Sequence, residues 1–253
     1  MTAAQAAARL LGLHRPGRPL VLPNIWDAAG ARLVEEAGFG AVATSSAAVA
    51  ESLGYRDHQG APAEEMFAAA GRIACAVSVP VTVDAEAGYG LPPQVLVDRL
   101  LAVGAAGCNL EDTDHQAGGL ADPVQHARWL AEVRAAAGDR LVINARVDVF
   151  LHAAGAPEED MLAAGLQRAR RYLDSGADCV YPIMARSPAT IARFVELGHP
   201  VNTLPRPGGP DLAAMAGLGV ARVSLAAGLW RAAQRWLAAE LATLTPADWA
   251  SSL

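Results

Sequence analysis

The 253-residue sequence contains no lysine, so all 20 of its basic side chains are arginines. Without lysine the chain lacks the residue that forms Schiff bases, holds phosphate in a P-loop or serves as a lysine general base. The net charge of −6 also argues against nucleic acid as a partner, because phosphate contacts need a concentrated basic surface. A local arginine still suffices to bind a small anion.

Cysteine and long apolar runs are scarce as well. Cys75, Cys108 and Cys179 each lie in an apolar segment without the C-x-x-C spacing of metal or redox sites, so we expect buried, reduced thiols. Residues 1–13 lack the charged start and cleavage site of a signal peptide, and no run of about 18 apolar residues follows. These features predict a cytoplasmic protein with no membrane or nucleic-acid partner.

Alanine, by contrast, fills 57 positions and favours helix. Short β-branched runs alternate with longer alanine-rich segments of helical period, which is the pattern of repeated βα units. Eight strands are expected, at Pro19–Pro23, Gly40–Thr44, Val79–Asp84, Gly107–Glu111, Leu141–Arg146, Ala177–Ile183, Pro200–Leu204 and Ala221–Leu225. Helices are expected at Ala28–Ala37, Ala63–Ala76, Pro93–Val103, Pro123–Ala137, Glu158–Ser175, Pro188–Leu197 and Asp211–Leu218.

Eight strand–helix units in a chain of this length predict a (β/α)8 TIM barrel, a single α/β domain over residues 1–253. The rival fold is a doubly wound open sheet, which usually has fewer strands and carries a glycine-rich fingerprint after its first strand. That position holds Pro23-Asn24-Ile25-Trp26-Asp27, which is no dinucleotide motif.

The helix expected after the last strand, at about residues 226–244, is more apolar than a barrel needs. Leu229, Trp230, Trp236 and Leu241 recur in it at helical spacing. Two interpretations remain open. The helix packs on its own barrel, or it contacts another subunit, because tryptophan-rich apolar surfaces are enriched at interfaces.

Acidic side chains gather where the predicted strands end, and in a barrel these ends meet at one mouth. Asp84 and Glu86 follow the third strand, Glu111 ends the fourth, and Asp57 lies in the loop after the second. Four carboxylates in one place repel one another, and a hard divalent cation with oxygen ligands relieves the repulsion. We therefore expect Mg²⁺, with Mn²⁺ as the alternative. Zinc is not expected, because no strand end supplies histidine or cysteine.

Further groups at the mouth suit an anionic substrate. Arg146, at the end of the fifth strand, pairs with the carboxylates, presents a fork to a substrate carboxylate, or does both. Ser45 and Ser46 follow the second strand, where hydroxyls and successive backbone N–H groups make an anion pocket. The segment Arg206-Pro207-Gly208-Gly209 is either a phosphate site or, as we prefer, a turn before the next helix.

These groups belong to a set of segments that follow one another in a recognisable order. The segments are Ser45-Ser46, Leu53-Gly54-Tyr55-Arg56-Asp57, Asp84-Ala85-Glu86-Ala87-Gly88-Tyr89-Gly90, Asn109-Leu110-Glu111-Asp112, Asn144-Ala145-Arg146-Val147-Asp148, Pro200-Val201-Asn202 and Val220-Ala221-Arg222-Val223-Ser224. In this set the chain resembles the isocitrate lyase/phosphoenolpyruvate mutase superfamily. The resemblance implies a Mg²⁺-dependent barrel that acts on small α-oxocarboxylates through an enolate-like intermediate and makes or breaks C–C or P–C bonds.

The same resemblance implies a role for each matching residue. Asp84 is similar to the direct metal ligand of the superfamily, and Glu86 and Glu111 resemble ligands that act partly through water. Asp57 resembles the aspartate near the metal and the reacting carbon. Substrate-binding groups are expected at Ser45, Ser46, Arg146 and Asn202. Members often exchange a C-terminal helix between subunits, which favours a homo-oligomer, either a dimer or a tetramer.

One position and one loop depart from the superfamily pattern. Members usually have aspartate where Glu86 stands, and the longer side chain has the reach to shift the metal or a bridging water. The isocitrate and methylisocitrate lyases carry a K-x-C-G loop after the fourth strand, whose cysteine is the catalytic acid, whereas residues 113–120 here contain neither lysine nor cysteine. His115 in this loop is the candidate proton donor, with a merely solvated histidine as the alternative.

The leading hypothesis is a Mg²⁺-dependent lyase or hydrolase that cleaves a C–C bond of a small 2-oxo or 2-hydroxy acid, with Asp57, Arg146 and His115 as catalytic residues. Phosphoenolpyruvate mutase or phosphonopyruvate-type P–C chemistry ranks second, because the loop lacks the asparagine and lysine of recognised mutases. A third alternative is a barrel without lyase activity, such as a hydroxymethyl transferase or a non-catalytic binding protein.

Overall fold

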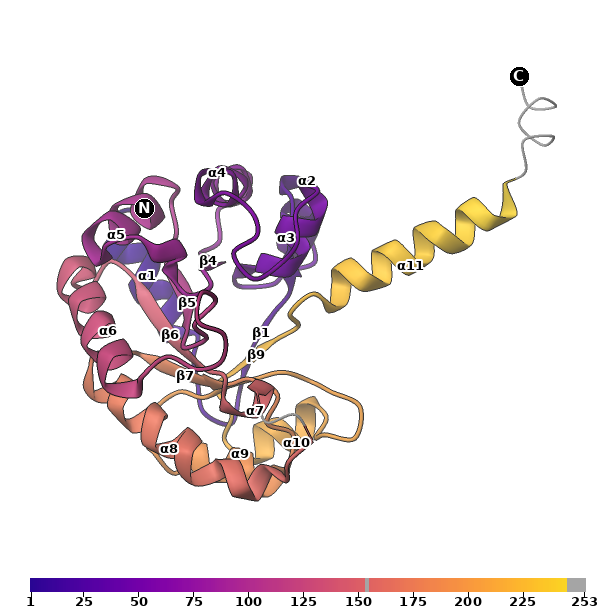
Figure 1. The fold of residues 1–253 in the computed structure, drawn as a ribbon. Helices are drawn as coiled ribbons and strands as arrows, with labels where there is room; N and C mark the ends of the chain where they lie inside the picture. Colours follow the sequence, from indigo (N-terminus) through magenta and orange to yellow (C-terminus); the bar gives the residue numbers. More distant parts are fainter. Residues whose placement is uncertain (153–154, 245–253) are drawn as a thin grey trace.

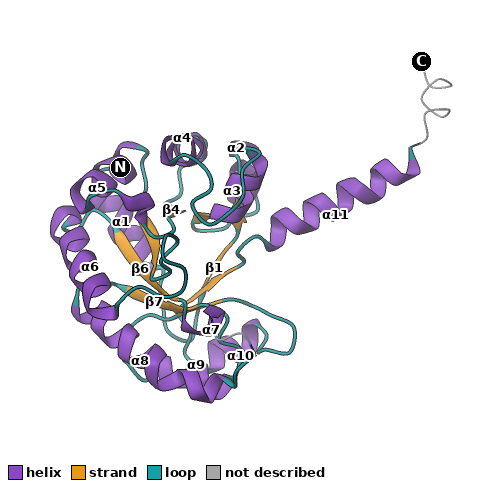
Figure 2. Cartoon of the chain, viewed as in Figure 1, coloured by secondary structure: helices purple, strands orange, loops and turns teal. Residues whose placement is uncertain are grey.

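Parallel strands line the centre of the molecule and helices surround them in the computed structural model, which describes residues 1–152 and 155–244 (Figures 1 and 2). The strands are β1 Leu20–Leu22, β2 Asn24–Ile25, β3 Val42–Thr44, β4 Val81–Asp84, β5 Gly107–Glu111, β6 Val142–Val147, β7 Cys179–Pro182, β8 Asn202–Thr203 and β9 Arg222–Ser224. The α-helices are α1 Ala3–Gly12, α2 Ala28–Glu36, α3 Ser46–Ser52, α4 Ala63–Ala74, α5 Pro93–Ala102, α6 Pro123–Ala137, α7 Val149–His152, α8 Glu158–Asp174, α9 Pro188–Val195, α10 Leu212–Gly217 and α11 Gly228–Thr243, and Gly88–Gly90 form a 3₁₀ turn.

The strands form two parallel sheets that are joined at both ends. One sheet has the order β2-β3-β4-β5-β6-β7 and the other has the order β1-β9-β8. β1 and β2 are two parts of one strand separated by Pro23, which has no N–H to donate. A parallel bridge between Val180 and Val201 connects β7 to the residues before β8. The strands therefore follow one another around a ring, as the expected (β/α)8 barrel requires.

Alternation along the strands decides which side chains enter the barrel. In β5, Cys108 and Leu110 join the apolar core between the strands and the helices, so Glu111 points inwards. The register places Glu111 beside Arg146 on β6, and Arg146 beside Tyr181 on β7. The layer of inward-facing side chains at the carboxyl ends of the strands is therefore polar and charged.

Each expected strand overlaps an observed one, with β6 ending one residue later than expected, but α1, α3 and α7 were not among the expected helices. α1 begins with a capping box formed by Thr2 and Gln5. It buries Leu10 completely against Leu20 and Val142, which are the first residues of β1 and β6. α1 thus covers the end of the barrel opposite the carboxyl ends.

α11 extends away from the barrel (Figure 1), and none of its residues is buried. Its first turn is anchored by Trp230. The ring centroids of Trp230 and Trp26 are 4.9 Å apart, and the Trp230 Nε1–H donates to Glu51. Beyond this turn the helix does not pack on its own barrel, and Trp236 is 64% exposed. The expected helix is therefore present, and a subunit contact stays a prediction.

The expected single domain runs to residue 253, of which residues 245–253 lie outside the described residues. Among the described helices, none is long and apolar enough to cross a membrane.

Candidate active site

A cavity of about 270 Å³ lies at the carboxyl ends of the strands. Most of the predicted site residues line it, namely Ser45, Ser46, Asp57, Asp84, Glu86, Glu111 and Arg146. Two do not. His115 lines a separate surface hollow. Asn202 is buried and its amide donates to Ser224 Oγ at 3.0 Å, and Ser224 is the residue of this pair that lines the cavity.

The acidic cluster is deeply buried. Glu86 and Glu111 are each 2% exposed, and their carboxylate oxygens and a ring nitrogen of His115 lie within 4.8 Å of one another. Asp84 faces the same cavity, where its Oδ2 accepts the Ser46 N–H at 3.0 Å. Its Oδ1 is buried without a partner in the described part of the chain. A buried carboxylate oxygen without a partner, beside two further buried carboxylates, fits the hard cation that the sequence predicts, with His115 as an additional neighbour.

The electrostatics of the cluster also favour a cation. Burial, followed by the Asp84 and Glu111 carboxylates, raises the pKa of Glu86 to about 8. Burial likewise raises the pKa of Glu111, although Arg146 and His115 oppose this effect. A bound cation would stabilise the charged carboxylates and so oppose both shifts.

We expect the metal-free protein to lose stability as the pH rises from about 6.5 to about 8. At lower pH the opposite effect of the buried His14 and His126, whose pKa values are lowered to about 4, outweighs that of Glu86. Across this range Glu86 keeps its proton in the folded state but has lost it in the unfolded state. His115 acts in the same direction, because its hydrogen bond to Glu111 raises its pKa and stabilises the fold only while the ring is protonated. Thermal unfolding in EDTA measures the fall, and Mg²⁺ should raise the Tm more at about pH 8 than at about pH 6. A flat Tm, or an equal Mg²⁺ shift at both pH values, would contradict this interpretation.

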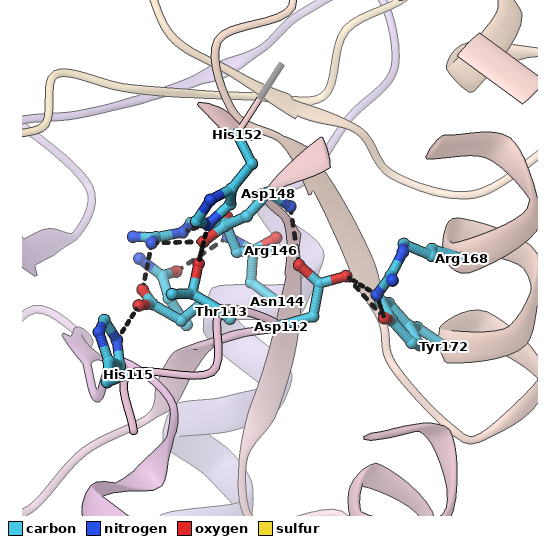
Figure 3. Close-up of polar contacts among 11 residues, drawn as sticks. Asp112, Thr113, His115, Asn144, Arg146, Asp148, His152, Arg168 and Tyr172 are labelled. Carbon is cyan, nitrogen blue, oxygen red and sulfur yellow. Dashed lines mark hydrogen bonds and ion pairs between the residues drawn. The ribbon is translucent and has the colours of Figure 1, made fainter. Parts of the chain in front are cut away.

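Arg146 is clamped by carboxylates on two sides (Figure 3). Its Nε and Nη2 donate to Asp148 Oδ1 and Oδ2 at 2.7 and 2.8 Å, and Nη2 also pairs with Glu111. Burial opposes the charge on Arg146, but Glu111 and Asp148 outweigh burial and hold its pKa above the usual range. Nη1 takes part in none of these contacts, so it is available to a carboxylate in the cavity.

Groups outside the barrel hold Asp148 in place (Figure 3). The Asp148 N–H donates to Asp112 Oδ1 at 2.8 Å, and Asp112 Oδ2 accepts Tyr172 Oη–H at 2.6 Å and Arg168 Nη1–H at 2.9 Å. The Thr113 hydroxyl donates to Asp148 Oδ2 at 2.5 Å. Asp112 and Asp148 lie in the segments that the sequence singles out. Arg168 and Tyr172 come from α8 and carry no sequence signal for this role.

The loop of residues 113–120 is tied to the site through His115, whose Nε2 lies 2.6 Å from Glu111 Oε1. The His115 ring lies 5.7 Å from that of His58, which does line the cavity. Sequence reasoning missed His58, although its position next to Asp57 is a signal. It also missed Tyr181, which lines the cavity and has a buried hydroxyl without a partner among the described residues.

Comparison with known proteins identifies the family. A sequence profile described as phosphoenolpyruvate phosphomutase matches residues 10–245. The chain belongs to this family. An uncharacterised protein of Mycobacterium tuberculosis is 36% identical over 227 residues, which cover 87% of this chain and 84% of that protein. Probable 2-methylisocitrate lyase 2 of Corynebacterium glutamicum is 32% identical over 183 residues, which cover 68% of this chain and 57% of the relative.

A solved structure supports the same assignment. A Burkholderia cenocepacia J2315 protein provisionally named a phosphonomutase is 40% identical, with a TM-score of 0.88 and coverage of 94% of this chain and 99% of that one. The predicted superfamily and its α/β barrel fold are thereby confirmed. Further relatives are named lyases and mutases, which confirms the prediction of an enzyme of this superfamily.

Proposed function

We propose that the family member described here is a Mg²⁺-dependent enzyme that cleaves a C–C bond of a small 2-oxo or 2-hydroxy carboxylic acid through an enolate-like intermediate. One observation carries the proposal. Asp84, Glu86 and Glu111 line the same cavity as Arg146, so a cation site and a guanidinium for a carboxylate lie side by side. Asp84, Glu86 and Glu111 would hold the cation, which supplies Lewis-acid stabilisation of the oxyanion charge when it is bound.

The protein groups around the cavity bind and orient the substrate. The substrate carboxylate is proposed to bind Arg146 Nη1 and the hydroxyl groups of Ser45 and Ser46. Because Asp148 fixes the guanidinium of Arg146, the carboxylate would be held in one orientation. The Ser46 N–H is already used by Asp84, so the anion pocket expected there relies on the remaining donors. Asp57 lies on the cavity wall and is proposed to act near the reacting carbon.

The identity of the proton donor can be tested with two histidine variants. His115 was the candidate from the sequence, but His58 lines the cavity whereas His115 is bound to Glu111. We expect His58→Asn to lower kcat by about 10²-fold and His115→Asn to lower it less, because proton transfer requires direct reach of the reacting atom. The pH dependence of kcat checks this, since loss of the acid removes one limb of the profile. A larger effect of His115→Asn would restore His115 as the donor.

P–C bond chemistry is the second candidate, because both the family profile and the Burkholderia relative carry phosphomutase or phosphonomutase names. Phosphorus NMR of a phosphonopyruvate incubation distinguishes it, since only cleavage or transfer of the P–C bond changes the phosphorus resonance. The loop of residues 113–120 lacks the asparagine and lysine of recognised mutases, so we rank this reaction second.

A panel of oxaloacetate, malate-like and isocitrate-like acids tests the proposed reaction. Purified protein with Mg²⁺ should release a 2-oxo acid or oxalate from at least one of them, and EDTA should abolish the release. If neither the panel nor phosphonopyruvate is converted while an analogue binds tightly, a non-catalytic binding protein replaces this proposal. Turnover in EDTA equal to that with Mg²⁺ would also contradict it.

We also propose that the protein is a homo-oligomer in which α11 covers a second copy. The exposed Trp236, Leu237 and Leu241 on a helix that leaves its own barrel support this arrangement. Light scattering of the full chain tests it, and a monomer at micromolar concentration would contradict it.

A further inference from the structure

The loop of residues 54–60, between α3 and α4, carries Asp57 and His58 into the cavity in an unfavourable backbone conformation. His58 has φ 65° and Gln59 has φ 57°, which side chains other than glycine rarely adopt. At Gly60 a Cβ would lie 2.5 Å from the carbonyl oxygen of Arg56, so the turn is tight as well. Such a turn persists only when contacts with the rest of the protein hold it.

One hydrogen bond provides that contact. The Gln59 N–H donates to Glu86 Oε2 at 2.6 Å. Within the described residues, no other hydrogen bond joins residues 56–60 to the barrel, and Arg56, His58 and Gly60 are exposed. The amide next to His58, two residues after Asp57, is thus attached directly to the strand end that carries the acidic cluster.

Glu86 is itself rigidly placed. It is 2% exposed, and its own φ of 48° is left-handed. Its backbone carbonyl accepts the Glu111 N–H at 3.0 Å, which fixes the peptide on which the side chain stands. The side chain therefore reaches Gln59 from a fixed base, and a carboxylate one methylene shorter would not span the same gap.

We propose that Glu86 is a positioning residue that fixes the 54–60 loop, and with it Asp57 and His58, over the cavity. The glutamate side chain at this position gives the carboxylate the reach to bind the loop. Glu86 accepts the Gln59 N–H through Oε2 and also lines the cavity. The roles of Asp57 and His58 rest on the proposed function, whereas the attachment of the loop does not.

Hydrogen–deuterium exchange of the full chain in EDTA tests the attachment without a metal or a substrate. Glu86→Asp keeps the charge and loses the reach, and Glu86→Gln keeps the reach with an amide oxygen as acceptor. We expect the Gln59 amide to exchange about tenfold faster or more in Glu86→Asp, and close to the wild-type rate in Glu86→Gln. Equal exchange in wild type and Glu86→Asp would overturn the proposal, as would faster exchange in both variants to the same extent.

The matched control is Glu35→Asp, which shortens a glutamate that accepts the Ser78 N–H at 2.9 Å far from the cavity. It should leave exchange in residues 54–60 unchanged, and exchange of the strand amides in every variant reports whether the barrel is folded. Once a substrate is known, Glu86→Asp should lower kcat more than it raises KM, because it misplaces reacting groups. Binding of oxalate with Mg²⁺ tests the proposed function separately. Failure of the loop attachment therefore does not imply failure of the proposed function, and the reverse also holds.

Discussion

Arg146→Lys is expected to lower kcat/KM by about 10²- to 10³-fold, the range seen when one donor to developing oxyanion charge is removed. Lysine keeps a cation between Glu111 and Asp148, but it presents a point charge instead of a planar fork. Its three N–H groups cannot serve both Asp148 oxygens and Glu111 and still offer a donor to the cavity. Steady-state kinetics measures the loss, together with a Tm that stays close to that of the wild type.

The choice of lysine matters because truncation would test a different property. Arg146→Ala leaves Glu111 and Asp148 buried without their shared cation, and an unpaired buried charge costs about 3–5 kcal/mol. Its loss of activity would therefore report unfolding. Arg99→Lys, on the exposed face of α5 at 3.7 Å from Glu64, is the matched control and should have wild-type activity. Wild-type kinetics in Arg146→Lys would contradict the proposed role of the planar guanidinium of Arg146.

Asp84→Asn is expected to weaken Mg²⁺ binding by about 10²-fold or more, since even residues that only orient a metal ligand are worth about 10- to 100-fold in affinity. The amide oxygen can still accept the Ser46 N–H, so the local structure is kept. One charge fewer in the cluster also lowers the repulsion that raises the pKa of Glu86. The metal-free variant should therefore unfold at a higher temperature than the wild type at about pH 8, while its stabilisation by Mg²⁺ disappears.

Titration calorimetry with Mg²⁺ and thermal unfolding with and without it check both halves of this prediction. Asp98→Asn removes the same charge from the exposed face of α5, where Asp98 accepts a hydrogen bond from Gln94, and serves as the control. If Asp84→Asn binds Mg²⁺ as tightly as the control does, the cation site lies elsewhere.

The strands and the residues at their ends could be predicted because each depends on local pattern. Alternation puts Glu111 and Arg146 inside the barrel, and parallel pairing then sets them side by side. The same logic was insufficient for Asn202, which lies on a strand near the mouth but one layer lower, where its amide is bound to Ser224. A strand position predicts the face of a side chain but not its depth.

Contacts between distant segments were beyond sequence reasoning. Tyr172 and Arg168 reach Asp112 across 60 and 56 residues, and nothing in the periodicity of α8 separates them from other half-buried positions. The choice between His58 and His115 likewise depended on how two loops fold over the cavity. By contrast, α1 has a local signal in its sequence, the Thr2–Gln5 capping box.

The central claim is that the acidic cluster and Arg146 form one site for a cation and a small carboxylate. Calorimetric titration of oxalate, a planar dianion with adjacent oxygens, tests it most directly. We expect oxalate to bind to the wild type only when Mg²⁺ is present, and more weakly by about 10-fold or more in Arg146→Lys. Equal oxalate binding in EDTA and in Mg²⁺, or no binding under either condition, would contradict the claim.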